Sequence, residues 1–157
     1  MLLIVWHSRT GASQALAQAA KAAAGKLAQL IAAEAAGPDD LLAARGYLFV
    51  CPENLGTMSG VMKELFDRCY YPLLGRIEGR PYASIIAAGS DGHGAQAQLD
   101  RIVTGWRLRR VAPPIIAMTH AQSPEEIMAS KTVPPAILAQ AAELGVGLAE
   151  GLELGIF

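Results

Sequence analysis

The stretch YLFVCPENLGTMSGVMKELFDRCYY, residues 47–71, combines three patterns one after another. It begins with a continuous apolar run at residues 47–51, which is typical of a strand buried on both faces. A polar, turn-forming segment follows at residues 52–59, and residues 60–71 then show an apolar stripe with helical spacing. A strand, a loop and a helix in this order form the repeating unit of parallel α/β sheets.

The same unit recurs along the chain. The patterns predict strands at residues 2–6, 27–33, 46–51, 82–88 and 108–118, and helices at about 13–24, 39–44, 60–71, 95–105 and 134–150. This alternation predicts an α/β fold, a five-stranded parallel sheet with helices on both faces, within a single domain covering residues 1–157. Pro113 and Pro114 interrupt the last strand and place it at a sheet edge, and Thr132 is expected to cap the final helix.

Composition excludes several classes of protein. The 157 residues include 13 basic and 14 acidic side chains, and the net charge of −1 does not favour nucleic-acid binding. No apolar run approaches the roughly 20 residues of a membrane span, and the N-terminus does not resemble a signal peptide. Cys51 and Cys69 occupy apolar positions, which predicts buried thiols in a reducing, cytoplasmic compartment.

Three loops with unusual composition follow strands of the predicted sheet. They cover residues 8–13, 52–59 and 89–94, and all are rich in glycine and small polar residues. Ligands of such folds bind beyond the carboxyl ends of the strands, so we expect the three loops to share one rim and to surround a ligand.

The first loop has the composition of an anion site. Ser8, Thr10 and Ser13 supply hydroxyls, and the first amides of the following helix lack intrahelical partners, which favours a phosphate monoester. The alternative is a capped helix that follows an ordinary turn. The nucleotide-binding patterns GxxxxGK[ST] and GxGxxG are both absent.

The second loop suggests contacts to a flat heterocycle, and the third suggests close approach to a ligand. Backbone groups of residues 52–59 are suited to the edge of such a ring, with Leu55 and Met58 against its face; alternatively, this is a structural loop in which Ser59 caps the next helix. The glycines of residues 89–94 permit close backbone approach or positive φ. His93 is expected to face solvent, and the scattered histidines and cysteines predict no metal site.

Three motifs together resemble flavodoxins and flavodoxin-like NAD(P)H-dependent FMN and quinone reductases. They are HSRTGAS at residues 7–13, PENLGTMSGVMKELFDR at residues 52–68 and AAGSDGHGA at residues 87–95. The resemblance implies a three-layer sandwich with sheet order 2-1-3-4-5 and bound FMN. It assigns the phosphate to Ser8, Arg9, Thr10, Gly11, Ala12 and Ser13; the isoalloxazine ring to Pro52, Glu53, Asn54, Leu55, Gly56, Thr57, Met58 and Ser59; and its other side to Gly89, Ser90, Asp91, Gly92, His93 and Gly94.

Two departures from the flavodoxin pattern bear on function. The three loops contain no aromatic residue, and the chain is nearly neutral, whereas electron-carrier flavodoxins are usually acidic. Both favour an FMN-dependent oxidoreductase that uses NAD(P)H to reduce a quinone, a flavin or a similar small acceptor. The alternatives are an electron-carrier protein and a flavin-free interaction domain. Tyr70, Tyr71 and Pro72 and the apolar residues of the helix predicted at residues 60–71 form a candidate surface for a homodimer. A buried helix face explains most of them equally well.

Overall fold

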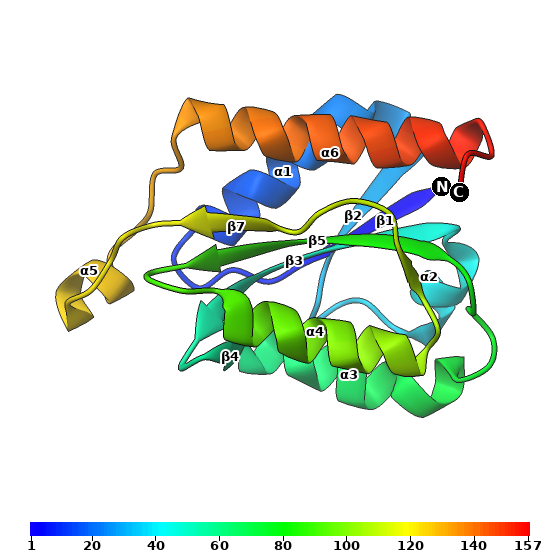
Figure 1. Cartoon of the computed structure of the whole chain (residues 1–157), viewed down its shortest axis with the longest axis horizontal. Helices are drawn as coiled ribbons and strands as arrows, with labels where there is room; N and C mark the ends of the chain where they lie inside the picture. Colours follow the sequence, from blue (N-terminus) through cyan, green and yellow to red (C-terminus); the bar gives the residue numbers. More distant parts are fainter.

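The computed structural model describes all residues, 1–157, and has three layers with the sheet in the middle (Figure 1). The strands are β1 (Leu2–Trp6), β2 (Ala28–Ala32), β3 (Gly46–Asn54), β4 (Thr57–Met58), β5 (Pro81–Ala88), β6 (Arg109–Arg110) and β7 (Ile115–Met118). The helices are α1 (Ala12–Ala24), α2 (Pro38–Ala43), α3 (Gly60–Leu73), α4 (His93–Gly105), α5 (Pro124–Met128) and α6 (Pro135–Glu153), with a 3₁₀ turn at Gly25–Leu27.

The sheet has the predicted order. Its path is β2-β1-β3-β5-β6, and β7 also pairs with β5, so that β6 and β7 are two pieces of the fifth strand. These pairings are all parallel, which confirms the order 2-1-3-4-5. Both pieces pair only with β5, which confirms the edge position predicted from Pro113 and Pro114, the prolines that lie between them.

The two faces of each central strand belong to different cores. Leu3, Val5 and Phe49 point into a cluster of 22 buried residues under α3 and α4, whereas Ile4 and Val50 belong to a cluster of 19 under α1 and α6. Strand side chains alternate between faces, so an unbroken apolar strand is expected where both faces are covered.

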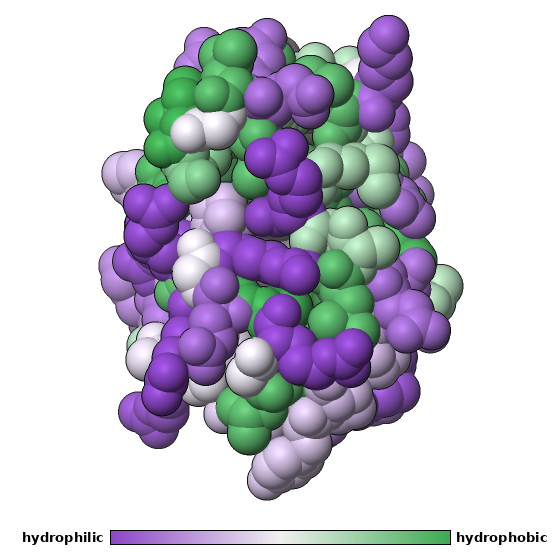
Figure 2. Space-filling view, turned by 90° about the vertical axis from the view of Figure 1, so that its right-hand side faces the viewer, coloured by the Kyte–Doolittle hydropathy of each residue, from purple (hydrophilic) through white to green (hydrophobic).

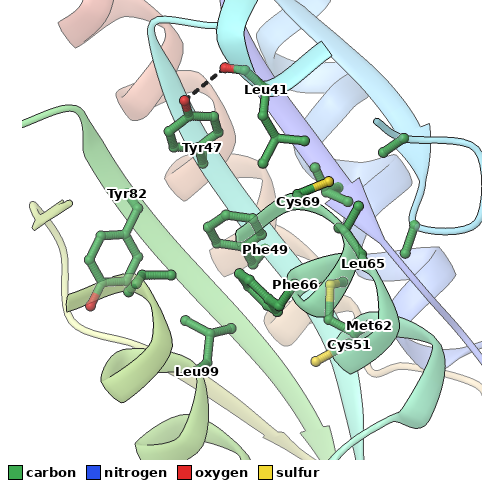
Figure 3. Packing of buried hydrophobic residues seen from close by; sticks show 14 of the residues in the cluster. Leu41, Tyr47, Phe49, Cys51, Met62, Leu65, Phe66, Cys69, Tyr82 and Leu99 are labelled. Atoms are coloured by element: carbon green, nitrogen blue, oxygen red, sulfur yellow. Dashed lines mark hydrogen bonds between the residues drawn. The ribbon is translucent and has the colours of Figure 1, made fainter. Parts of the chain in front are cut away.

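The two cores differ in the size of their side chains. The cluster on the α3 side contains aromatic rings, with the Phe49 and Phe66 centroids 5.2 Å apart, and the two free cysteines are buried in it (Figure 3). The Tyr47 hydroxyl on this face donates a 2.8 Å hydrogen bond to the carbonyl of Leu41. The other cluster is rich in alanine, which allows α1 and α6 to lie close together.

Several predicted boundaries were wrong. Residues 52–59 are not an open loop, because β3 continues to Asn54 and forms a hairpin with β4. Helix α4 begins at His93, so Gly94 lies within it, and the polar stretch 119–133 contains α5, whose Ser123–Glu126 capping box stabilises its start. Helix α6 begins after Pro134, and no side chain caps it, so Thr132 does not have the expected role.

The two ends of the sheet differ in character. Both chain termini lie at the end where the strands begin, and Figure 2 shows this end as hydrophilic areas interspersed with hydrophobic ones. At the opposite end the loops after β1, β3 and β5 come together, with α5 beyond them (Figure 1). None of the helices combines the length and apolar character needed to cross a bilayer.

Candidate functional site

Two adjoining cavities lie at the carboxyl ends of the strands. The inner cavity, of about 60 Å³, is lined by Ser8, Arg9, Thr10, Ala12, Ser13, Pro52, Glu53, Asn54, Ala87, Ala88, Gly89, Thr119, Ala121, Ile127 and Lys131. The outer cavity, of about 300 Å³, is lined by Arg9, Glu53, Asn54, Leu55, Gly56, Gly89, Ser90, Ala121 and Ile127. Six residues are common to both, so the two cavities form one continuous hollow.

The inner cavity contains the start of α1. Gly11 has φ of 105°, a conformation that favours glycine, and its amide donates a 3.0 Å hydrogen bond to the Ser8 hydroxyl. The first intrahelical bond comes from Ala15, which donates to the Gly11 carbonyl at 3.0 Å. The amides of residues 12–14 have no acceptor within the chain and carry the positive end of the helix dipole.

Ser13 is the most informative side chain of the inner cavity. Ser13 is 1% exposed, and its hydroxyl is the one buried side-chain polar atom without a hydrogen-bond partner. A buried hydroxyl without a partner costs free energy, so an acceptor supplied by a ligand would improve its environment. Together with the free amides, this orphaned hydroxyl fits a phosphate monoester.

The outer cavity is bordered by the tip of the β3–β4 hairpin. Leu55 and Gly56 form the tip with φ of 54° and 76°, the left-handed pair that a two-residue turn between twisted strands requires. Leucine is unusual there, and its side chain is completely exposed. Met58 instead points into the core and is 2% exposed, so it does not lie against a ligand as expected.

Glu53 connects the second and third loops. One oxygen of its carboxylate accepts from the Gly92 amide and the other from the Ala95 amide, both at 2.9 Å. Both amides lie at the start of α4, where a negative charge is stabilised by the helix dipole. This bridge fixes the hairpin against the third loop and thereby shapes both cavities.

His7 connects the first loop to the second. Its Nδ1 lies 2.8 Å from the hydroxyl of Ser59, and burial lowers the pKa of the imidazole below its ordinary value of 6.5, against the opposing effect of Glu34. Ser59 precedes α3, but its hydroxyl makes no capping hydrogen bond. The pairing with His7 thus replaces the expected capping role.

Two glycines of the third loop permit close backbone contacts. A Cβ atom on Gly89 would lie 2.5 Å from the carbonyl oxygen of Ala121, and one on Gly94 would lie 2.1 Å from that of Gly56. Gly92 has φ of 90°. His93 is exposed, as predicted, and its Nδ1 lies 2.7 Å from the Asp91 carboxylate, whose pKa this contact lowers.

Sequence reasoning placed most, but not all, of the cavity residues. Eight of the predicted residues line neither cavity: Gly11, Thr57, Met58, Ser59, Asp91, Gly92, His93 and Gly94. Six lining residues were missed: Ala87, Ala88, Thr119, Ala121, Ile127 and Lys131. Four of these six lie after Met118, where β7 ends. The predicted topology contained a signal for this segment, because it too begins at the carboxyl end of a strand.

Lys131 anchors the segment between β7 and α6, residues 119–134, to the first loop. Its amide donates to the Thr10 carbonyl at 2.8 Å, and its Nζ lies 3.4 Å from the Thr10 hydroxyl. The same Nζ donates to the carbonyls of Glu126, Ile127 and Ala129 at 2.7, 2.9 and 2.5 Å. A cation is thereby held beside the start of α1.

The sequence matches the model of the family described as NADPH-dependent FMN reductase over residues 33–123, more than half of the chain. The chain belongs to the NADPH-dependent FMN reductase family. The matched region includes the second and third loops and ends at residue 123, in the segment between β7 and α6. No curated protein sequence matches the chain significantly.

Solved structures show that this family member has a flavodoxin-like fold. It superposes on a flavodoxin from the domain Archaea with a TM-score of 0.76 and 16% identity, covering 97% of this chain and 98% of that one. A WrbA-like flavodoxin from Agrobacterium tumefaciens gives 0.76 and 19%, covering 98% and 97%. A flavodiiron protein from Giardia intestinalis gives 0.76 and 16%, where 98% of this chain corresponds to 36% of the other.

Proposed function

We propose that this protein is an FMN-dependent oxidoreductase that uses NAD(P)H to reduce a quinone, a flavin or a similar small acceptor. When bound, FMN would supply the redox chemistry, and the chain would supply binding and orientation. The observation that carries the proposal is the inner cavity, where the buried, unpartnered hydroxyl of Ser13 lies beside the free amides that begin α1.

The proposed phosphate site is formed by the loop from Ser8 to Ser13. Hydroxyls and amide N–H groups can donate hydrogen bonds to a dianion there, and Gly11 allows the backbone to turn around it. The ring would occupy the outer cavity, between the hairpin at Glu53–Gly56 and the loop at Gly89–Ser90. His7, Ser59, Gly92 and Gly94 would act indirectly, by holding the three loops together.

The outer cavity supports an enzyme rather than a closed electron carrier. No aromatic side chain lines either cavity, so none is positioned to cover the face of a ring. A face that is not covered is accessible to the nicotinamide of NAD(P)H and to a flat acceptor. The net charge of −1 gives no strong field for docking a charged redox protein.

The two free cysteines support the expected reducing, cytoplasmic environment. Both are buried, and burial raises the pKa of the Cys51 thiol to about 12. A thiol in that state is neither a nucleophile nor a metal ligand at neutral pH. Neither cysteine therefore has a part in the proposed reaction.

The experiment is a titration of the purified protein with FMN, followed by an assay of NADH and NADPH oxidation with a quinone or free flavin as acceptor. We expect saturable quenching of flavin fluorescence and turnover that depends on added FMN. Tight FMN binding without oxidation of either nucleotide would refute the enzyme and favour an electron carrier. Absence of FMN binding would refute both and favour an interaction domain.

A further inference from the structure

We propose that Lys131 supplies a positive charge to the phosphate site, so that the pocket selects FMN over riboflavin. The inference rests on the proposed function. It adds a specificity residue from the segment between β7 and α6, which lies far in sequence from the HSRTGAS loop.

Lys131 lies beside the first loop. Lys131 lines the inner cavity together with Ser8, Thr10 and Ser13. Its backbone is fixed there, because its amide donates to the Thr10 carbonyl at 2.8 Å, and its Nζ lies 3.4 Å from the Thr10 hydroxyl. An anion that reaches the hydroxyls of the first loop would therefore lie close to this ammonium group.

The Lys131 ammonium group has no counter-charge within the protein. None of the five ion pairs in the structure includes Lys131, whose Nζ contacts only backbone carbonyls and the Thr10 hydroxyl. Two acidic residues of this region, Glu126 next to Lys131 and Glu53 in the same cavity, have carboxylates that are engaged elsewhere. Glu126 accepts from the amides of Gln122 and Ser123, and Glu53 accepts from the start of α4. The positive charge is thus left for an anionic ligand.

The Ser13 hydroxyl lacks a hydrogen-bond acceptor that the protein could supply. This group is 1% exposed and unpartnered, and it lines the same cavity as Lys131. The oxygens of a phosphate group would satisfy this hydroxyl and the free amides of α1. The Lys131 ammonium group already donates to three backbone carbonyls, so it would contribute its positive charge. The attraction between opposite charges acts only on an ionised ligand, so Lys131 would favour the phosphorylated flavin specifically.

The test compares FMN with riboflavin, which has the same ring but no phosphate. We would measure both dissociation constants by flavin fluorescence for the wild type, Lys131→Gln and Lys131→Arg. Lys26→Gln is the matched control, because Lys26 is exposed in the 3₁₀ turn before β2, at the opposite end of the sheet. Thermal melts would verify folding, and Lys131→Met would replace Lys131→Gln if that variant were unstable.

We expect Lys131→Gln to weaken FMN binding about tenfold, because the phosphate loses a neighbouring positive charge, and to leave riboflavin binding within about twofold. Lys131→Arg should retain most of the preference for FMN, and Lys26→Gln should change neither constant. An unchanged FMN constant in Lys131→Gln would overturn the inference. An equal weakening of both ligands would also overturn it, because Lys131 would then only hold the segment in place. A wild type that binds no FMN would refute the proposed function itself.

Discussion

The Nδ1 atom of His7 lies 2.8 Å from the hydroxyl of Ser59, although 52 residues separate them in the chain. His7 follows β1 and Ser59 precedes α3, so this contact joins the loop of the proposed phosphate site to the hairpin of the proposed ring site. Burial favours the neutral imidazole, because the charged form loses hydration. The connection between the two loops should therefore depend on pH.

We expect His7 to make the folded state less stable in acid. Its pKa is lowered from 6.5 in the folded state, so below about pH 6.5 the unfolded state binds more protons. The stability that neutral His7 contributes is present above this pH and is lost as the pH falls through the folded pKa. Denaturant unfolding between pH 8 and pH 5 should show a smaller decrease for His7→Gln than for the wild type.

The control for this prediction is His120→Gln, which replaces an exposed histidine whose ring makes no hydrogen bond. Its stability should decrease with falling pH as in the wild type. Identical pH profiles for His7→Gln and the wild type would show that His7 does not titrate differently in the two states.

Ser13→Ala should have opposite effects on stability and on FMN binding. Without ligand, the substitution removes a buried hydroxyl that has no partner, so the free energy of unfolding should rise by about 1 kcal/mol. FMN affinity should fall about tenfold, because the phosphate loses a donor. Urea unfolding and flavin titration would measure the two effects.

Ser84→Ala is the matched control, since Ser84 is also 1% exposed but donates a 2.8 Å hydrogen bond to Gln96. This variant should be destabilised by about 1 kcal/mol, because the buried Gln96 oxygen loses its donor. If both serine variants lose stability equally, the Ser13 hydroxyl has a partner within the protein.

Glu53→Gln should loosen the contact between the hairpin and α4. The neutral amide has one acceptor oxygen instead of two and no charge to interact with the helix dipole, so we expect a loss of about 1 kcal/mol. FMN affinity should fall too, because the hairpin borders the outer cavity. Thermal unfolding and flavin titration would measure both.

Asp67→Asn provides the comparison for Glu53→Gln. It also neutralises a carboxylate, but in the exposed Lys63–Asp67 pair of α3, which should contribute less than about 0.5 kcal/mol. An effect of Glu53→Gln no larger than that of Asp67→Asn would contradict a structural role for the bridge.

Two neighbouring glycines of α6 should respond oppositely to alanine. A Cβ atom on Gly145 would lie 2.5 Å from the carbonyl oxygen of Ala20 in α1, whereas a Cβ atom on Gly147 would meet nothing within 4 Å. Gly145→Ala should destabilise the fold by about 2 kcal/mol, because α1 and α6 must separate. Gly147→Ala should stabilise it by up to about 1 kcal/mol, the helix propensity difference.

Urea unfolding of the two variants would measure this contrast. Each variant is a control for the other, because both replace a glycine of α6 with alanine. Equal stability of the two would mean that α1 and α6 can move apart at little cost, and that their small residues do not set the distance between them.

The sequence by itself determined the layers of this protein. Leu2 to Trp6 and Tyr47 to Cys51 are apolar on both faces, and such strands are stable only when helices cover both sides. The alternation of strands and helices then requires the parallel order and brings the carboxyl ends of the strands to one rim. The first loop was identifiable for the same reason, since its hydroxyls directly follow a buried strand and precede a helix.

Only the tertiary structure decided which groups meet at that rim. Lys131 lies 121 residues after Thr10, and their contact depends on how the segment containing α5 returns from β7 toward α6. Hydrophobic periodicity and turn preferences act over a few residues, so they carry no information on contacts of this range. The bonds from Glu53 to α4 and the orphaned state of Ser13 likewise arise from packing between elements, which no local pattern specifies.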